Sequence, residues 1–213
     1  MKGPLLSPAP GKGPGCSAQR RACWLRVEEL EDRRLLSRSV FSLDSSWQFL
    51  RQDSAGAAAV SFDDSAWTAV TLPHTWNNLD GQDGGNNYYR GIGWYRRHYT
   101  VPANLAGQEF FIKFDGANLI TDLYVNGAFV GEHVGGFAAF AWDLTPYLTV
   151  GADNVLAVKV NNALYLGAAP LSGDITWDGG LYRHVNLIAT DPLHISLTDY
   201  ASPGVYLQQT NVS

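Results

Sequence analysis

The stretch LYVNGAFV, residues 123–130, decides the fold of this chain. An Asn-Gly dipeptide separates two short apolar runs, and both Asn126 and Gly127 accept the positive φ angles that a type I′ turn requires. This pattern is the strongest short-range indication of a β-hairpin. We therefore expect two antiparallel strands that meet at residues 126 and 127.

Strand patterns of the same kind recur on both sides of this hairpin. Side chains alternate with a period of two over residues 110–115 and 155–160, which places one set of each on a core face. One set comprises Phe110, Ile112, Phe114, Leu156, Val158 and Val160, and the other comprises Phe111, Lys113, Asp115, Val155, Ala157 and Lys159. The sequence GADN at 151–154 marks a turn before a strand, and Gly179-Gly180 open a last strand over 181–189. Without helix-length patterns or a fixed repeat, the fold class predicted is an all-β antiparallel sandwich rather than βαβ units, a propeller or a solenoid.

The composition supports a folded domain and excludes several function classes. The chain has 213 residues, of which 46% are hydrophobic and 16% charged, so a sizeable core can be buried. A net charge of −5 gives no electrostatic reason to bind nucleic acid or an anionic membrane. No stretch reaches the ~18 apolar residues of a membrane span. Neither nucleic acid nor a membrane is an expected partner.

Residues 1–39 differ from the rest in composition. Residues 1–15 are rich in Gly and Pro, and residues 20–37 mix charges with loosely helical apolar spacing, so we expect a disordered or partly helical leader. The sequence LEDRRLLS at 30–37 resembles a Leu-Glu-x-Arg-x-Leu-Leu-Ser signature near the N-termini of some large bacterial surface and exported proteins. This resemblance predicts export to the periplasm or the cell exterior, with a cytoplasmic location as the alternative.

Patterns for catalysis and metal binding are sparse. The two cysteines, Cys16 and Cys23, lie in the leader, and none of the five histidines has metal-ligand spacing, so we expect no disulfide framework, metal or other cofactor. His74 and His133 are predicted to be hydrogen-bonded residues of loops, His133 in a flexible connection. The pairs Asp63/Asp64 and Asp80/Asp83 lie in stretches typical of turns, where Asp closes an Asx-turn or faces water. No catalytic residue is therefore assigned.

Tryptophan is the distinctive residue type, with 7 in the chain. Most of those in the body are predicted to fill the core, because each indole buries a large area. Others can border a cleft, where an aromatic face packs against the C–H side of a polyol. The loops that hold Trp76 and Trp177 also carry Asn, Asp and Gly, which makes them the better candidates for such a surface.

Several longer motifs resemble one family when taken together. In chain order they are PHTWN (73–77), GIGWYRR (91–97), FDGA (114–117), YVNG (124–127), GEHVGGF (131–137), NVLAVKVNN (154–162) and GGLYRHVNL (179–187). They resemble the N-terminal sugar-binding domain of glycoside hydrolase family 2, which contains β-galactosidases, β-mannosidases and β-glucuronidases. The first two motifs look most like β-galactosidase-like bacterial members. Over about residues 41–195, the resemblance implies a jelly-roll β-sandwich of the galactose-binding-like type.

The resemblance also implies substrate-binding residues. In the β-galactosidases an Asp located six residues before the Gly of the Gly-Ile/Leu-aromatic-Arg strand hydrogen-bonds the sugar in the active site. Counting back from Gly180 gives Asp174, for which a plain loop turn is the alternative. Asn77 and Trp177 are the other substrate-binding candidates on this rim. Arg183, in the same motif, is predicted to form an internal ion pair.

The family pattern predicts three parts: a leader over 1–39, a sugar-binding domain over 40–196 and the start of an immunoglobulin-like domain over 197–213. Family members cleave glycosides with two glutamates on a (β/α)₈ barrel, which takes ~250 residues, and no position here maps onto either glutamate. We thus expect the non-catalytic part of a β-galactosidase-like enzyme, truncated before its barrel and inactive alone. Its expected partners are a weakly bound β-galactoside and the missing barrel. The alternatives are a free-standing carbohydrate-binding module and an interaction domain without sugar contact.

Overall fold

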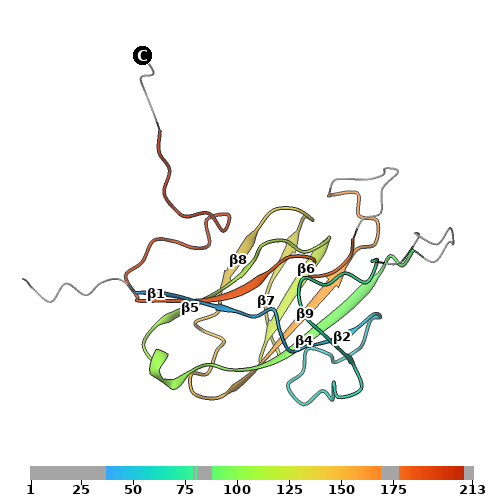
Figure 1. Ribbon diagram of the computed structural model, residues 1–213, viewed down its shortest axis with the longest axis horizontal. Helices are drawn as coiled ribbons and strands as arrows, with labels where there is room; N and C mark the ends of the chain where they lie inside the picture. Colours follow the sequence, from blue (N-terminus) through green and yellow to red (C-terminus); the bar gives the residue numbers. More distant parts are fainter. Residues whose placement is uncertain (1–36, 79, 81–87, 169–177, 209–213) are drawn as a thin grey trace, which may run out of the picture. The chain divides into compact units, whose positions relative to one another are not determined.

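The computed structural model describes residues 37–78, 80, 88–168 and 178–208, which form two antiparallel β-sheets (Figure 1). One sheet has the order β1 (Arg38–Ser42), β10 (Val185–Thr190), β5 (Glu109–Phe114) and β8 (Phe140–Asp143). The other has the order β3 (Thr68–Val70), β2 (Trp47–Leu50), β4 (Ile92–Thr100), β9 (Asp153–Asn161), β6 (Ile120–Val125) and β7 (Ala128–Val134). Within the described residues the only helical segment is a 3₁₀ turn, η1 (Ala103–Leu105). The predicted antiparallel sandwich is confirmed.

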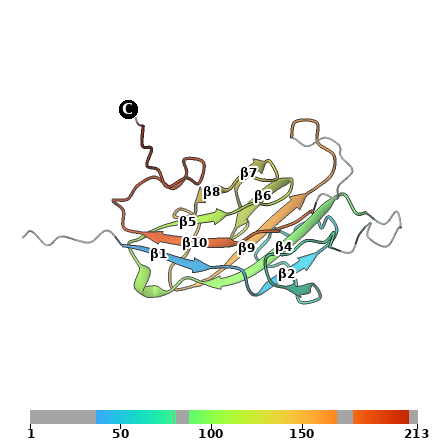
Figure 2. The ribbon, with the colours of Figure 1, turned by 45° about the horizontal axis from the view of Figure 1, so that its top comes forward.

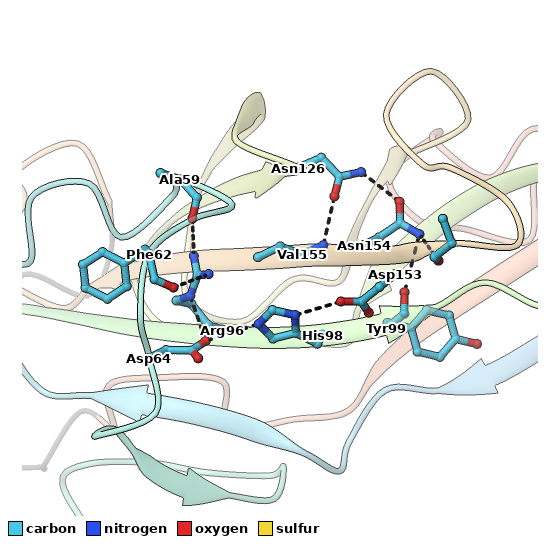
Figure 3. A network of polar contacts seen from close by, with 11 residues as sticks. Ala59, Phe62, Asp64, Arg96, His98, Tyr99, Asn126, Asp153, Asn154 and Val155 are labelled. Atoms are coloured by element: carbon cyan, nitrogen blue, oxygen red, sulfur yellow. Dashed lines mark hydrogen bonds and ion pairs between the residues drawn. The ribbon is translucent and has the colours of Figure 1, made fainter.

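The predicted hairpin forms between β6 and β7. Asn126 and Gly127 adopt φ angles of 51° and 83°, and Val125 pairs with Ala128 across the turn. The Asn126 side chain also holds the turn against the start of β9: its Oδ1 accepts from Val155 N at 2.9 Å, and its Nδ2 donates to Asn154 Oδ1 at 2.8 Å (Figure 3). The turn residue thus fixes the position of the hairpin as well as its register.

The core lies between the two sheets, where β10 and β5 face β4 and β9 (Figure 2). The set with Phe110, Ile112, Phe114, Leu156, Val158 and Val160 belongs to one buried cluster, so the prediction that one alternating set lies on a core face is confirmed. Trp47 and Tyr95 lie in the same cluster with no exposed surface. Trp76 and Trp94 are also buried, whereas Trp67 and Trp142 are partly buried and pack against apolar clusters.

A second apolar layer covers the outer face of the six-stranded sheet. Ala57, from the segment between β2 and β3, packs on Trp94 of β4 and Ala157 of β9. Arg96, also on the outer face of β4, is completely buried, and its Nε lies 2.8 Å from Asp64 Oδ2 (Figure 3). Asp64 does begin a turn, since its carbonyl accepts from Trp67 N at 3.0 Å, but its carboxylate meets Arg96 instead of closing an Asx-turn or facing water. Its neighbour Asp63 does close an Asx-turn, accepting from Ser65 N at 3.0 Å.

Three local predictions, for the start of the last strand, Arg183 and His133, are wrong. The last strand begins at Val185, four residues later than expected, so Arg183 precedes it and is exposed; its Nη1 donates to Asp115 O and Phe137 O at 3.2 and 3.3 Å. The internal position predicted for Arg183 is thereby excluded. His133 lies on β7 rather than in a flexible connection, stacked on Phe140 with ring centroids 3.9 Å apart.

Parts of the chain outside the sandwich bear on the remaining predictions. The leader's helix-like pattern falls in residues 1–36, outside the described residues. Residues 202–208, expected to begin a second domain, contain no strand. In the portion of the chain that the structure describes, no helix has the length and apolar character needed to cross a membrane.

Candidate functional site

The structure describes only one of the three predicted substrate-binding residues. Asp174 and Trp177 fall in 169–177, outside the described residues, so their contact with a sugar stays a prediction. Asn77 lies between β3 and β4 and is completely buried. Its own contact with a sugar likewise stays a prediction. What the structure does show is how Asn77 organises the chain around it.

The Asn77 side chain uses all of its hydrogen-bonding capacity within the protein. Its Nδ2 donates to Asp80 Oδ2 at 2.9 Å and to the carbonyl of Tyr89 at 3.0 Å. Its Oδ1 accepts from Asn162 Nδ2 at 3.1 Å and from Gly179 N at 2.8 Å. Two donors and two lone pairs are thereby satisfied, as a buried amide requires. We call Asn77, Asp80 and Asn162 the amide hub.

The other two hub residues extend these contacts to neighbouring segments. Asn162 directly follows β9, and its Oδ1 accepts from Gly91 N at 2.8 Å. Asp80 is 7% exposed; its Oδ2 accepts from Tyr89 N at 3.0 Å, and its Oδ1 lies 3.6 Å from Arg51 Nη1. Asp80 does lie in a turn, as predicted, but its carboxylate is buried and does not face water. The hub joins four separate parts of the chain at one end of the sandwich.

Gly179 fits against the hub because it has no side chain. A Cβ at this position would lie 2.4 Å from Asn162 Nδ2 and 2.4 Å from Trp76 Cζ2. Trp76 in turn stacks on Phe49 with ring planes 11° apart and is a core residue, 5% exposed. The chain that leaves residues 169–177 is thus held directly against the core.

An open depression of about 340 Å³ lies beside the hub. Its lining includes Trp76, which packs beside Gly179, and Arg51, which pairs with Asp80. Trp67 and His74 add a second indole and an imidazole to the same surface. Aromatic faces next to a few polar groups are typical of small-molecule sites. At this end of the domain, a depression lined by aromatic and polar side chains lies beside backbone that the hub holds in place.

His74 is held in its neutral form by its surroundings. Its Nδ1 lies 2.8 Å from the Tyr95 hydroxyl, which also accepts from Leu181 N at 3.4 Å. Complete burial raises the pKa of Tyr95, so its hydroxyl keeps its proton and can donate it to Nδ1 of the His74 tautomer that is protonated on Nε2. Burial also lowers the pKa of His74 below its ordinary 6.5. The hydrogen-bonded role predicted for His74 is confirmed.

We expect the domain to lose stability as the pH falls below about 6.5. The folded-state pKa of His74 lies below the unfolded value, so the unfolded chain takes up a proton first and acid favours unfolding. Burial shifts the pKa of His133 in the same direction. Thermal melts between about pH 5 and pH 8 measure the effect, and His74→Gln should reduce the slope. Equal melting temperatures at the two ends of this range would contradict the expectation.

The comparison with protein families identifies the chain. Residues 32–191 match the model described as glycosyl hydrolases family 2, sugar binding domain. The chain belongs to glycoside hydrolase family 2. The resemblance predicted from the ordered motifs is therefore confirmed, and the jelly-roll sandwich is the sugar-binding domain of this family.

Relatives within the family include enzymes named for two different sugars. A β-glucuronidase from Bacteroides fragilis is 44% identical over 144 residues, covering 68% of this chain and 21% of the relative. The β-galactosidase BoGH2A from Bacteroides ovatus is 37% identical, covering 74% and 19%. The crystal structure of a Bacteroides uniformis β-glucuronidase superposes with a TM-score of 0.77 at 41% identity, covering 83% and 21%. This chain spans about one fifth of the length of these relatives.

Sequence reasoning missed two of the three hub residues as functional candidates. The Gly- and Asn-rich surroundings of Asp80 predict a turn and do not indicate that its carboxylate is buried. Asn162 ends the NVLAVKVNN motif that supports the family assignment, yet no chemistry was attached to it. A polar Asn directly after a buried strand was the available indication, because such a residue needs partners once its strand is covered.

Proposed function

We propose that this chain binds carbohydrate weakly and forms one wall of a glycosidase pocket whose catalytic groups lie on another domain. The observation that carries the proposal is the match of residues 32–191 to the family's sugar-binding domain. The relatives' names suggest a β-galactoside or a β-glucuronide as the sugar. The contacts that we propose are Asp174 and Trp177, just before the anchored Gly179; Asn77, which is buried and fully hydrogen-bonded, is proposed to support this rim from within the protein.

The affinity expected for the chain alone is low. One hydrogen bond to a carboxylate contributes ~1.5–3 kcal/mol, and a stacked ring adds a similar amount. A total near ~4 kcal/mol corresponds to a Kd of ~1 mM. A wall with so few contacts suits a pocket completed by a second domain, where further groups hold the same sugar.

Titration by NMR tests this proposal. We expect methyl β-galactoside or methyl β-glucuronide to shift amide signals of the full chain with a Kd of ~1 mM or weaker. Asp174→Ala should weaken binding about tenfold, because it removes the charged acceptor. Asp63→Ala is the matched control, since Asp63 is exposed and its carboxylate serves only an Asx-turn in the described structure. No signal shift with either sugar, or an equal effect of both variants, would contradict the proposed contacts.

A second candidate function is a free-standing carbohydrate-binding module. The depression beside the hub favours it, because this domain by itself has a concave surface lined by aromatic and polar side chains. A micromolar Kd in the same titration would support the module over the incomplete pocket. For the incomplete pocket we expect no hydrolysis of aryl β-galactosides or β-glucuronides by the pure chain, and activity after addition of a separately expressed family barrel.

We further propose roles for the two ends of the sequence. Residues 1–39 are proposed as a leader that directs export, on the basis of the LEDRRLLS stretch at 30–37. Residues 197–213 are proposed as the beginning of an immunoglobulin-like domain. Exposed apolar side chains at Val205, Tyr206 and Leu207 support this second proposal, because a following domain would cover them.

A further inference from the structure

We propose that Asn77 and Asn162 are positioning residues that couple the chain at Asp80 and Tyr89 to the chain at Gly179. Loss of a hydrogen bond at Asp80 then alters the hydrogen bond at Gly179 through the side-chain amide of Asn77. This inference deepens the proposed function, on which its consequence for sugar binding rests, because Gly179 follows the proposed contacts Asp174 and Trp177 closely. The coupling itself is a property of the described residues.

The direct path from Asp80 to Gly179 consists of two hydrogen bonds. Asp80 Oδ2 accepts from Asn77 Nδ2 at 2.9 Å, and Asn77 Oδ1 accepts from Gly179 N at 2.8 Å. Donor and acceptor belong to one planar amide, so rotation that serves a new partner on one side withdraws the group from the other. Tyr89 joins the same path, since its N–H donates to Asp80 Oδ2 and its carbonyl accepts from Asn77 Nδ2.

Burial makes these bonds hard to replace. Asn77 and Asn162 are 0% and 1% exposed, and Asp80 is 7% exposed. An amide that loses a partner here cannot turn to bulk water, so it reorients toward whatever acceptor remains. Gly179 has no room to follow, because Trp76 and Asn162 already lie against it. Loss of the Asp80 acceptor should therefore leave the Gly179 N–H without its partner.

The opposite end of β9 supplies a matched comparison. There Asn126 Nδ2 donates to Asn154 Oδ1 at 2.8 Å, and Asn154 Nδ2 donates to the carbonyl of Thr149 at 2.9 Å. Asn154 is as buried as Asn77. Strand β9 separates the two amide pairs by about 25 Å. A substitution at Asn154 thus removes a similar group without touching the path to Gly179.

Amide hydrogen exchange of the full chain, followed by NMR, tests the coupling. The readout is the exchange rate of the Gly179 amide divided by that of Val158, a fully buried residue of β9. We expect Asp80→Ala to raise this ratio about tenfold. Asn154→Ala should accelerate exchange generally and leave the ratio unchanged. A merely structural role for Asp80 would instead give the two variants the same ratio, which would overturn the proposal.

Two further variants keep the test decisive. Asp80→Asn preserves an oxygen at the position that accepts from Asn77 and Tyr89, so it should restore the wild-type ratio. Asn162→Asp has nearly the same shape but replaces the donor to Asn77 Oδ1 by an acceptor. The Asn77 amide should then turn its nitrogen toward position 162, and the Gly179 N–H loses the Oδ1 acceptor. A raised Gly179 ratio in Asn162→Asp supports the coupling even if Asp80→Ala does not fold, and an unchanged ratio opposes it.

The sugar titration separates this inference from the proposed function. If the unmodified chain binds methyl β-galactoside or methyl β-glucuronide, Asp80→Ala should weaken binding about tenfold without contact to the sugar. Unchanged affinity would refute the link between the hub and the proposed contacts. If the unmodified chain shows no sugar-dependent shifts, the proposed function fails, while the exchange ratios still decide whether the hub couples its two sides.

Discussion

Replacing Arg96 by methionine is expected to lower the free energy of unfolding by ~3–5 kcal/mol. Arg96 is completely buried, and its Nε donates to Asp64 Oδ2 at 2.8 Å. Methionine fills a similar apolar volume but removes the 2.8 Å partner of the Asp64 carboxylate, whose Oδ2 keeps only the longer contact with His98 Nε2 at 3.8 Å. Removing one member of a buried ion pair costs more than the pair itself contributes, because the remaining charge stays desolvated.

Backbone carbonyls add to this expected loss. The Arg96 guanidinium also donates to the carbonyls of Ala57, Ala59 and Phe62, two of which are drawn in Figure 3. These three carbonyls belong to the segment that covers the outer face of β4, and buried acceptors without donors are costly. Arg96 therefore holds a whole segment on the sheet, so the variant should also expose that segment.

Urea denaturation followed by tryptophan fluorescence measures the loss, and limited proteolysis within residues 51–67 detects release of the segment. Arg183→Met is the matched control, because Arg183 also donates to two carbonyls but is exposed. We expect the control to change stability by no more than about 0.5 kcal/mol. Equal losses in both variants would show that the Arg96 contacts contribute no more than surface hydrogen bonds.

Asp63 and Asp64 illustrate how far sequence reasoning reaches in this fold. Alternation along residues 110–115 and 155–160 identifies the inner face correctly, because a period of two follows from the strand itself. It cannot show that a coil segment covers the outer face of β4. Composition predicts a turn for both aspartates, and both lie in one; the carboxylate of Asp63 closes an Asx-turn, whereas that of Asp64 meets Arg96, 32 residues later in the chain.

The amide hub marks the same limit at the candidate site. The ordered motifs predict the family, and the family's fold places Asn77 near the predicted sugar-binding rim. The partner of Asn77 at Gly179 lies 102 residues away, and that at Asn162 lies 85 residues away. Nothing in local pattern or propensity encodes which polar side chains meet across such separations. The direction of the Asn77 amide, toward the protein's own backbone, emerges only from the packed structure.

Trp47→Ala is expected to cost ~3–5 kcal/mol, chiefly through the cavity it would leave between the sheets. Trp47 has no exposed surface, and its ring meets Tyr95 edge-on with centroids 6.3 Å apart. Its Nε1 donates to the carbonyl of Leu43 at 2.5 Å. Arg97 Nη1 donates to the same carbonyl, so that oxygen keeps a partner after the substitution. The loss should thus reflect packing rather than an unsatisfied acceptor.

Trp67→Ala separates the contribution of the core from that of the outer layer. Trp67 is partly buried and packs against Phe62 in the outer cluster, with ring centroids 5.4 Å apart. We expect a loss of about 1–2 kcal/mol, because less apolar area is removed from water. Urea denaturation of both variants, with near-ultraviolet circular dichroism to follow aromatic packing, compares them directly. If Trp67→Ala costs as much as Trp47→Ala, the covering segment is as essential to this domain as the sandwich interior, and the fold requires both layers to form together.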